Sequence, residues 1–197
     1  MDDPRVTAIL ASVPAGELGP GVVERARTGD ADAFAELIRH HDAGLRALAY
    51  RLLGDRDRMD DVLQEAYVKA YRALPGFGGR ASVGTWLYRI AYNTCLDELR
   101  HSARVVDLPL AEMGERRDQG PGVAERVARR RHLAEALSSL SPEDRATVLL
   151  VDGQGFDYRE AGEVLGVPQG TVASRLNRAR AQLRRALADD VRGVSEG

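Results

Sequence analysis

The sequence is poor in cysteine and aromatic residues, and it contains no long apolar run. A single cysteine, Cys95, excludes an internal disulfide and favours a reducing compartment. Aromatic residues make up 5% of the chain, while alanine, leucine and arginine are frequent, which favours helices over sheets. No apolar run approaches the length that crosses a bilayer, and the N-terminus lacks a signal-peptide pattern. These absences predict an all-α, cytoplasmic protein without membrane insertion.

The sequence also lacks the spacings that mark metal sites and common catalytic sites. The histidines are too scattered for a metal site. Neighbouring residues on a helix point to different sides, so His40 and His41 are expected to be solvated. No nucleophile elbow, phosphate-binding loop or catalytic carboxylate pair stands out. We therefore expect no metal, no cofactor and no enzymatic activity.

The composition changes along the chain and divides its 197 residues into parts. Residues 102–124 are rich in glycine and proline and carry charges of both signs, so they can build little core. The sequence predicts two small helical domains joined by a flexible linker. The expected parts are an N-terminal tail (1–20), a first domain (21–101), the linker (102–124), a second domain (125–190) and a C-terminal tail (191–197).

Residues 157–185 have the pattern of two short helices joined by a tight turn. Asp157 and Glu160 fit a reciprocal capping box, and Gly166 suits a helix end that needs a positive φ. Apolar residues then recur at steps of four, three and four and predict one buried stripe of the second helix: Val172, Leu176, Ala179 and Leu183. This pattern is typical of a helix-turn-helix whose second helix enters the DNA major groove.

The side of the second helix opposite this stripe is basic. Between Leu165 and Leu187 there are five arginines and no acid. Such a segment attracts phosphate, and its binding to DNA should weaken with salt. The chain as a whole has a net charge of −2, so any DNA affinity must come from this local segregation of charge. On charge alone, an ordinary amphipathic helix with a solvated arginine face remains the alternative.

The first domain is expected to contain a short helix over 22–27 and longer helices over 30–53, 58–74 and 83–100. The helix expected over 58–74 carries a polar patch near its start, made by Asp60, Asp61, Gln64 and Glu65. Acids at this position interact favourably with the helix macrodipole. The alternative interpretation is a docking patch for a basic partner.

Phe77 lies in a glycine-rich loop between two of these helices. It can be a plug on the core or a stacking platform for an unpaired base. The helix over 83–100 mixes aromatic and polar residues: Trp86, Tyr88, Arg89, Tyr92 and Asn93. This mixture suits single-stranded nucleic acid, and it equally fits a core helix with ordinary amphipathic edges.

Several segments together resemble a known family. They are DVLQEAYVKAYRAL, the loop with Phe77, TWLYRIAYNTCLDELR and LSPEDRATVLLVDGQGFDYREAGEVLGVPQGTVASRLNRAR. In this order, and separated by a linker, they resemble bacterial RNA polymerase sigma factors of the extracytoplasmic-function (ECF) group. The resemblance covers about residues 22–100 and 126–187, and its specificity comes from the order of several motifs.

The resemblance implies that the first domain is sigma region 2 and the second is sigma region 4. Such a protein binds core RNA polymerase through the β′ clamp helices and β, reads the −35 element as duplex and the −10 element as melted DNA, and starts transcription of a stress or developmental regulon. An anti-sigma factor is the expected inhibitory partner. The alternative is a helix-turn-helix regulator that does not bind core polymerase as a sigma subunit.

The resemblance also implies three groups of site residues. Those expected to bind the β′ clamp helices are Asp60, Asp61, Gln64 and Glu65. Those expected to contact the −10 element are Phe77, Arg80, Arg89 and Asn93, with Phe77 and Asn93 at the positions of a pocket that captures a flipped base. Those expected to read the −35 element are Thr171, Ser174, Arg175, Asn177 and Arg178.

The sequence departs from the family pattern at several positions. Ala173 stands where members often carry arginine or lysine, which removes an expected DNA contact. Gly162 stands where alanine is common, and the change predicts a helix about 1 kcal/mol less stable. Gly78 and Gly79 also differ from the usual loop, so the −10 preference of other members does not transfer.

Overall fold

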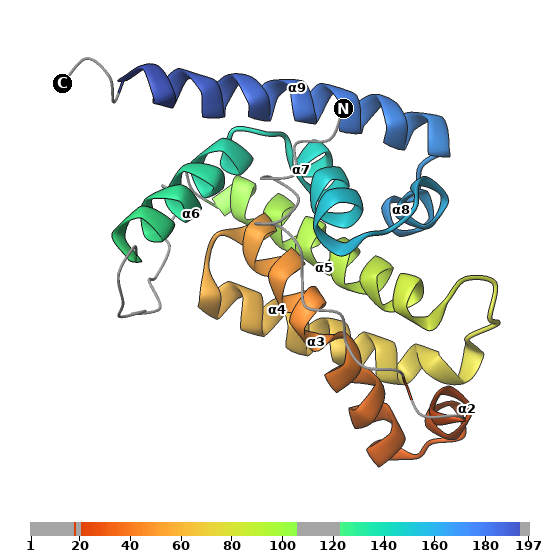
Figure 1. Cartoon of the computed structure of the whole chain (residues 1–197). Helices are drawn as coiled ribbons and strands as arrows, with labels where there is room; N and C mark the ends of the chain where they lie inside the picture. The colour runs from red at the N-terminus through yellow and green to blue at the C-terminus, as the bar shows by residue number, and fades with distance from the viewer. Residues whose placement is uncertain (1–17, 19–20, 106–122, 194–197) are drawn as a thin grey trace.

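The computed structural model describes Leu18 and residues 21–105 and 123–193, and this described part of the chain forms helices and no strands (Figure 1). In chain order the elements are α2 (Val22–Arg27), α3 (Ala31–Leu53), α4 (Arg56–Ala73), the 3₁₀ turn η1 (Leu74–Gly76), α5 (Val83–Val105), α6 (Val123–Ser138), α7 (Pro142–Val148), the π-helical turn η2 (Leu149–Gly153), α8 (Tyr158–Leu165) and α9 (Gln169–Gly193). The all-α prediction is confirmed.

Short-range capping sets several of the helix ends. The Asp30 carboxylate accepts the backbone N–H groups of residues 32 and 33 at 3.0 Å and begins α3. Gly54 ends α3 with a φ of 73°, a conformation that glycine adopts without strain. Ser141 caps α7 by accepting the amide of Asp144 at 3.2 Å. These contacts form within one turn, so the local sequence contains all their determinants.

Two helix boundaries differ from the predicted ranges. Helix α4 begins at Arg56, because the Asp55 carboxylate accepts the amide of Arg58 and therefore caps the helix earlier. Helix α5 continues through Val105 rather than ending near residue 100. After α7, residues 149–153 form a π-helical turn, and Gly155 then lies outside the helices with a φ of 76°. Most of the predicted linker and tails, namely residues 1–17, 19–20, 106–122 and 194–197, lies outside the described residues.

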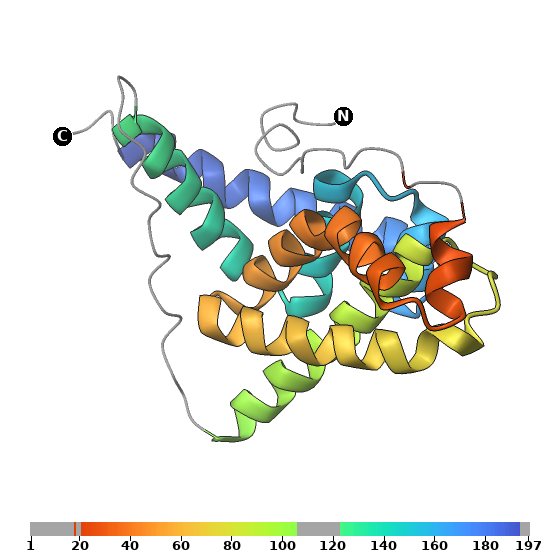
Figure 2. The ribbon, with the colours of Figure 1, turned by 90° about the horizontal axis from the view of Figure 1, so that it is seen from below.

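The described side chains form two buried clusters. The smaller cluster joins α2 to α3, α4, η1 and α5, and its buried members are Val22, Ala26, Ala33, Leu37, Ala70, Leu74 and Leu87. Figure 2 shows the ribbon of α2 beside that of α3. The larger cluster contains Leu45 and Leu63 from the first half of the chain and Leu149 and Leu176 from the second. The two halves therefore share one apolar core.

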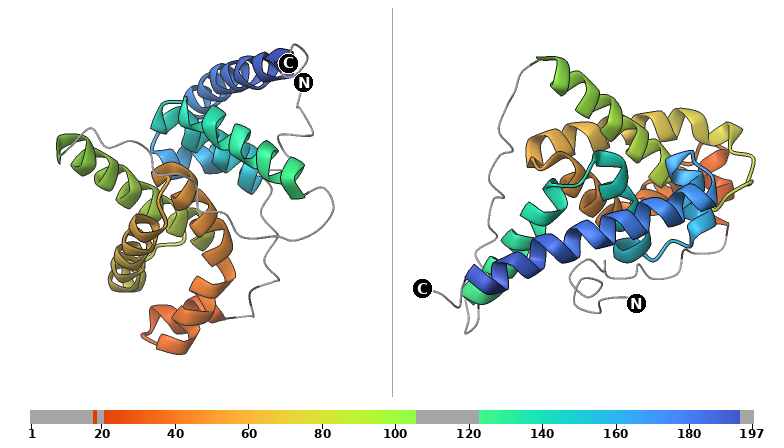
Figure 3. Two further views of the ribbon diagram at one scale, coloured as in Figure 1. Left: turned by 90° about the vertical axis from the view of Figure 1, so that its left-hand side faces the viewer. Right: turned by 90° about the horizontal axis from the view of Figure 1, so that it is seen from above.

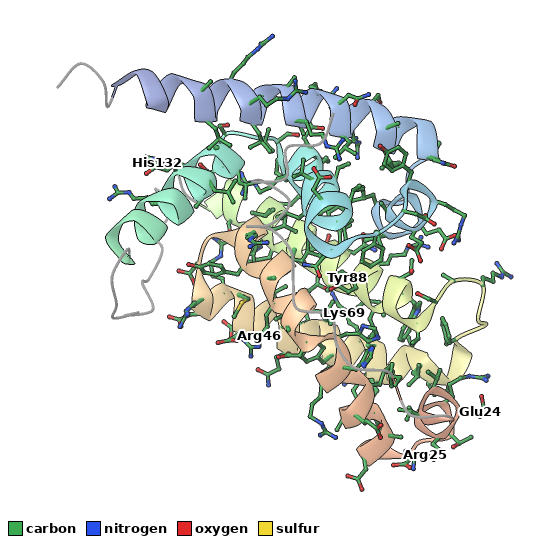
Figure 4. All side chains as sticks on the ribbon, viewed as in Figure 1. Glu24, Arg25, Arg46, Lys69, Tyr88 and His132 are labelled. Carbon is green, nitrogen blue, oxygen red and sulfur yellow. The ribbon has the colours of Figure 1, made fainter. Side chains whose placement is uncertain are left out.

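Tyr88 of α5 is central to the contact between the halves (Figure 4). Its hydroxyl donates a hydrogen bond of 2.9 Å to the side-chain oxygen of Gln154, and its ring meets Phe156 edge-on at 4.9 Å. Gly44 of α3 leaves the space for this arrangement, since a Cβ there would overlap the Tyr88 hydroxyl. An aromatic pair of this geometry adds about 1 kcal/mol to the free energy of packing.

Arg145 of α7 joins both halves through hydrogen bonds to backbone carbonyls. Its side chain donates to the carbonyls of Arg51 and Leu52 at the end of α3. It also donates to the carbonyls of Ser138 and Leu140 in its own half, at 2.8 and 3.2 Å. Because the last carbonyls of a helix have no partner within it, Arg145 satisfies acceptors that would otherwise be buried alone.

His41 of α3 is partly buried, contrary to the expectation that both adjacent histidines are solvated. Its ring meets that of His40 edge-on at 4.6 Å, and its Nε2 atom has no hydrogen-bond partner. Burial, and secondarily the charge of His40, lowers the pKa of His41 from 6.5 to about 4.

This depressed pKa predicts a loss of stability on acidification. Between pH 6.5 and about 4 the unfolded chain binds a proton at His41 that the folded chain does not, so stability falls as the pH falls through this window. We expect His41→Gln to reduce the loss between pH 7 and pH 5 by about 1 kcal/mol, measured by urea unfolding. His101→Gln, at an exposed position, is the control. An equal pH dependence in wild type and His41→Gln would contradict the prediction.

Candidate nucleic-acid interface

Helices α8 and α9 form the helix-turn-helix that the sequence predicts. Asp157 accepts the amide of Glu160 at 2.7 Å, and the Glu160 side chain accepts the amide of Asp157 at 3.1 Å, which completes the capping box. Gly166 ends α8 with a φ of 68°. Pro168 then precedes the first residue of α9. The predicted apolar stripe of α9 is buried at all four positions: Val172, Leu176, Ala179 and Leu183.

Gly162 has a packing role in this turn. A Cβ at position 162 would lie 2.7 Å from the backbone oxygen of Val167, a distance that real Cβ atoms essentially never show. The amide of Val167 in turn donates to the carbonyl of Gly162 at 3.0 Å. The low helix propensity of glycine is therefore offset by the close approach of the turn to α8.

Helix α9 runs along the outside of the second half, above α7 and α8 (Figure 3, right). Among the five residues expected to read the −35 element, Ser174, Asn177 and Arg178 are exposed, and Thr171 and Arg175 are partly exposed. Ser174, Asn177 and Arg178 are spaced i, i+3 and i+4, so they share one side of the helix. The structure thus presents three adjacent polar side chains on the outer face of α9.

Two of the five arginines in this segment are paired with acids from other elements. Arg178 binds the carboxylate of Asp144 in α7 with two hydrogen bonds of 2.8 and 2.7 Å, and this pairing raises its pKa. Arg180 binds Asp152 of η2 in the same two-bond manner. The charge of +5 counted along the segment is therefore partly neutralised in the folded protein.

The four residues of the polar patch, Asp60, Asp61, Gln64 and Glu65, are all exposed and lie together on the first half of α4. Asp60 pairs with Arg46 of α3 at 2.6 Å, and Glu65 pairs with Lys69 one turn along α4 at 2.8 Å. Exposed pairs of this kind contribute little to stability, about 0–1 kcal/mol each. The macrodipole explanation and the docking explanation are both compatible with this geometry.

An open groove of about 850 Å³ lies beside the patch, between α3 and α4. Its lining includes Leu63, Tyr67, Val68 and Tyr71 together with Asp60 and Gln64 of the patch. Val68 and Tyr71 are 43% and 45% exposed, which is unusual for large apolar side chains. Neither residue has a role in the sequence-based predictions, although their i, i+3 spacing outside the buried residues of α4 is visible in the sequence.

The residues expected to contact the −10 element lie on the loop after η1 and on α5. Phe77 is partly buried, and its ring centroid is 5.2 Å from that of Trp86. Arg80, Arg89 and Asn93 are exposed. Trp86, Arg89 and Asn93 follow one another along one side of α5, and Asn93 lies about 10 Å along the helix axis from Trp86. Phe77 contacts the Trp86 end of this row. The structure shows no direct contact between Phe77 and Asn93.

The two tyrosines that the sequence places among these aromatic and polar residues are buried. Tyr88 is 6% exposed and Tyr92 is 2% exposed. Burial, followed by the charge of Glu143, raises the pKa of Tyr92 to about 12. Their rings pack inside the protein and are not available to stack on bases, so the mixed surface is reduced to Trp86, Arg89 and Asn93.

Within the described residues, no three histidine, cysteine or acidic side chains are grouped so as to hold a metal ion. None of the described helices is long and apolar enough to cross a membrane.

Two family models match the chain in the order of its two halves. The Sigma-70 region 2 model matches residues 37–105, and the Sigma-70 region 4 model matches residues 130–183. The first match takes in most of α3 together with α4 and α5, and the second runs from α6 into α9.

Curated proteins and solved structures show the same similarity. The ECF RNA polymerase sigma factor SigM of Mycobacterium tuberculosis is 39% identical over 159 residues, which cover 81% of this chain and 79% of SigM. The RNA polymerase sigma-H factor of Pseudomonas aeruginosa is 34% identical over 178 residues, which cover 84% of this chain and 92% of that protein. The structure of CnrH in complex with the cytosolic domain of CnrY has a TM-score of 0.66 and 28% identity, and covers 86% of this chain and 96% of the matched one.

Proposed function

Because the chain belongs to the ECF RNA polymerase sigma factors, we propose that it binds core RNA polymerase, directs it to specific promoters and starts transcription there. The observation that carries this proposal is the presence of region 2 and region 4 in order on one chain. The protein acts as a specificity subunit and has no catalytic activity of its own. A stress or developmental regulon is the target we propose.

In this proposal, α9 reads the −35 element in the major groove. Ser174, Asn177 and Arg178 face outward on one side of α9, and Thr171 and Arg175 flank them. Arginine suits guanine, asparagine suits adenine, and serine adapts to either. Ala173 is partly exposed beside them and offers only a methyl group, so recognition depends on the other side chains.

Core polymerase binds the face formed by Asp60, Asp61, Gln64 and Glu65 through its β′ clamp helices in this proposal. All four are exposed, and the negative charges of Asp60, Asp61 and Glu65 suit a basic helical partner. The apolar groove next to the patch supports the proposal, since Val68 and Tyr71 offer exposed surface that a partner would bury. Region 4 is proposed to contact β.

The row from Phe77 to Asn93 is proposed to contact the melted −10 element. Flipping a base out of the duplex costs a few kcal/mol of unstacking free energy, which stacking and hydrogen bonding in a pocket can offset. The Phe77 ring packs against Trp86 at an interplanar angle of 48°, and the exposed Arg80 and Arg89 provide positive charge on the same loop and helix. Asn93 can hydrogen-bond a base edge at the far end of the row.

The proposed domain units are residues 21–101 for region 2 and 125–190 for region 4, with 102–124 connecting them and tails at 1–20 and 191–197. An anti-sigma factor is the proposed inhibitory partner, supported by the solved complex of the similarly folded sigma factor RpoE from Bartonella quintana with the anti-sigma factor NepR. Since core polymerase and promoter DNA are the proposed partners, we place the protein in the cytoplasm.

Gel filtration with purified core polymerase tests the proposal against the alternative of a regulator that uses only α8 and α9. A sigma factor is expected to co-elute with core enzyme at equimolar ratio. A regulator of the alternative kind would elute alone and still bind duplex DNA. Co-elution would exclude the alternative, and separate elution would reject the proposal.

The −10 assignment predicts a defect in promoter opening. Phe77→Ala and Asn93→Ala are each expected to slow opening about tenfold or more, because each removes one contact to the unstacked base. Permanganate footprinting of thymines in the bubble measures opening, while binding of a −35 duplex by the same holoenzyme should stay unchanged. The control is Asp97→Ala, an exposed position further along α5. Normal opening in both variants would reject the pocket.

A further inference from the structure

The two charged pairs of α9 have the same hydrogen-bond pattern but different surroundings. Arg178 is 62% exposed at its side chain, while its partner Asp144 is 6% exposed. Arg180 and its partner Asp152 are 24% and 8% exposed, so both ends of that pair are enclosed. In the first pair the carboxylate is buried and the arginine side chain extends into solvent. This arrangement is expected when the carboxylate sets the orientation of the arginine.

Asp144 is itself held firmly in place. It lies in the first turn of α7, where its amide is capped by the Ser141 hydroxyl at 3.2 Å, and Pro142 precedes it in the same turn. The residues that follow it in α7 are buried through Val148. The position of the carboxylate is therefore set by the core, and it in turn sets the position of the Arg178 guanidinium.

Asp144 binds one edge of the Arg178 guanidinium, and the other edge is available for a second partner. Asp144 accepts from Nε and from one hydrogen of Nη2. The remaining edge, formed by Nη1 and the second hydrogen of Nη2, presents two parallel donors. This fork matches the O6 and N7 acceptors of guanine in the major groove. Arg178 can thus keep its pair with Asp144 and bind a base bidentately at the same time.

We propose that Asp144 is a positioning residue for base recognition, which fixes the Arg178 guanidinium with its Nη1/Nη2 edge directed at a guanine of the −35 element. The proposal rests on the proposed function, since it requires that α9 reads DNA. A fixed arginine loses less conformational freedom on binding and tolerates fewer alternative bases than a mobile one. The cost is that Asp144 cancels one positive charge near the phosphates.

Asp144 orients Arg178 and also cancels its positive charge. Asp144→Asn tests both effects, because it removes the charge of the carboxylate and keeps its size. We expect discrimination at one base pair of the −35 element to fall about tenfold. Binding to unrelated duplex should become tighter, and its salt dependence should steepen by about one phosphate equivalent, because Arg178 is no longer neutralised. Asp152→Asn is the matched control and should leave the discrimination within about twofold, because Arg180 points inward.

The measurement uses holoenzyme assembled with core polymerase. A preferred −35 duplex is first selected from a randomised pool, and the dissociation constant is then measured for that duplex, for its single-base variants and for an unrelated duplex. Asp144→Asn is also combined with Arg178→Ala, which lacks the guanidinium. In that background Asp144→Asn should change the discrimination no further, since the two residues act as one unit.

The outcomes are distinguishable. If the wild-type holoenzyme selects no duplex, the proposed function itself fails. If the wild type selects a duplex and Asp144→Asn keeps the full discrimination at every position, Asp144 does not position Arg178. A uniform loss of affinity for all sequences, with a lowered melting temperature like that of Asp152→Asn, would also overturn the proposal and make Asp144 a structural residue only. Asp144→Glu, which keeps the charge and displaces it by one methylene, should give an intermediate loss of discrimination.

Discussion

Replacing both Asp61 and Glu65 with arginine is expected to lower the affinity for core RNA polymerase about 100-fold or more. Both residues are exposed on α4, and Glu65 carries only a surface pair with Lys69. The double substitution turns an acidic face basic opposite a basic partner, and like-charge contacts at an interface cost several kcal/mol. A loss of about 3 kcal/mol corresponds to roughly 100-fold in the dissociation constant.

Fluorescence titration of labelled protein with core enzyme gives the dissociation constant directly. The matched control is Glu24→Arg with Asp97→Arg, which makes the same change in net charge at exposed positions on α2 and α5. The control should bind core enzyme within about threefold of the wild type, because long-range effects on net charge are screened at physiological salt. Equal losses in both double variants would show that overall charge, and not this face, governs binding.

Arg145→Met is expected to destabilise the folded protein by about 3 kcal/mol. Arg145 is 8% exposed and donates to carbonyls from both halves of the chain. Methionine keeps much of the apolar stem but provides no donor, so several buried carbonyls lose their hydrogen bonds. Because two of these carbonyls close α3 and two belong to the segment before α7, the substitution weakens the contact between the halves as well as the second half itself.

Urea unfolding followed by circular dichroism measures this loss. Arg159→Met is the control, since Arg159 forms an exposed pair with Glu163 on the surface of α8 and should cost less than about 0.5 kcal/mol. If the halves unfold together in the wild type, Arg145→Met should also make unfolding less cooperative. Equal unfolding free energies for the two variants would contradict the role given to Arg145.

The sequence predicts the helices well where the determinants are local. Asp30, Ser141 and the Asp157–Glu160 capping box each act within one turn, and the capping box is present as predicted. The helix-turn-helix also follows from a short stretch of residues, because its stripe, cap and glycine turn are adjacent in sequence. The helical fold class and the family follow from these patterns and from the order of the motifs.

Contacts between distant residues could not be predicted in the same way. Arg178 and Asp144 are 34 residues apart, and Tyr88 and Gln154 are 66 apart. The charge counted along α9 omitted acids that come from α7 and η2. Tyr88 and Tyr92 looked like stacking residues because the helices that cover them lie beyond the predicted linker. The polymerase and DNA residues were assigned through the family resemblance, and they stay predictions until their variants are measured.

The central claim is that the first half of the protein binds polymerase and melted DNA, while the second half binds duplex DNA upstream. Run-off transcription with core polymerase on a library of randomised promoters tests this claim most directly. With the wild-type protein and no inhibitor, we predict transcripts that begin at a fixed distance downstream of two enriched sequence elements. Transcripts no more frequent or better positioned than those from core polymerase alone would contradict the account.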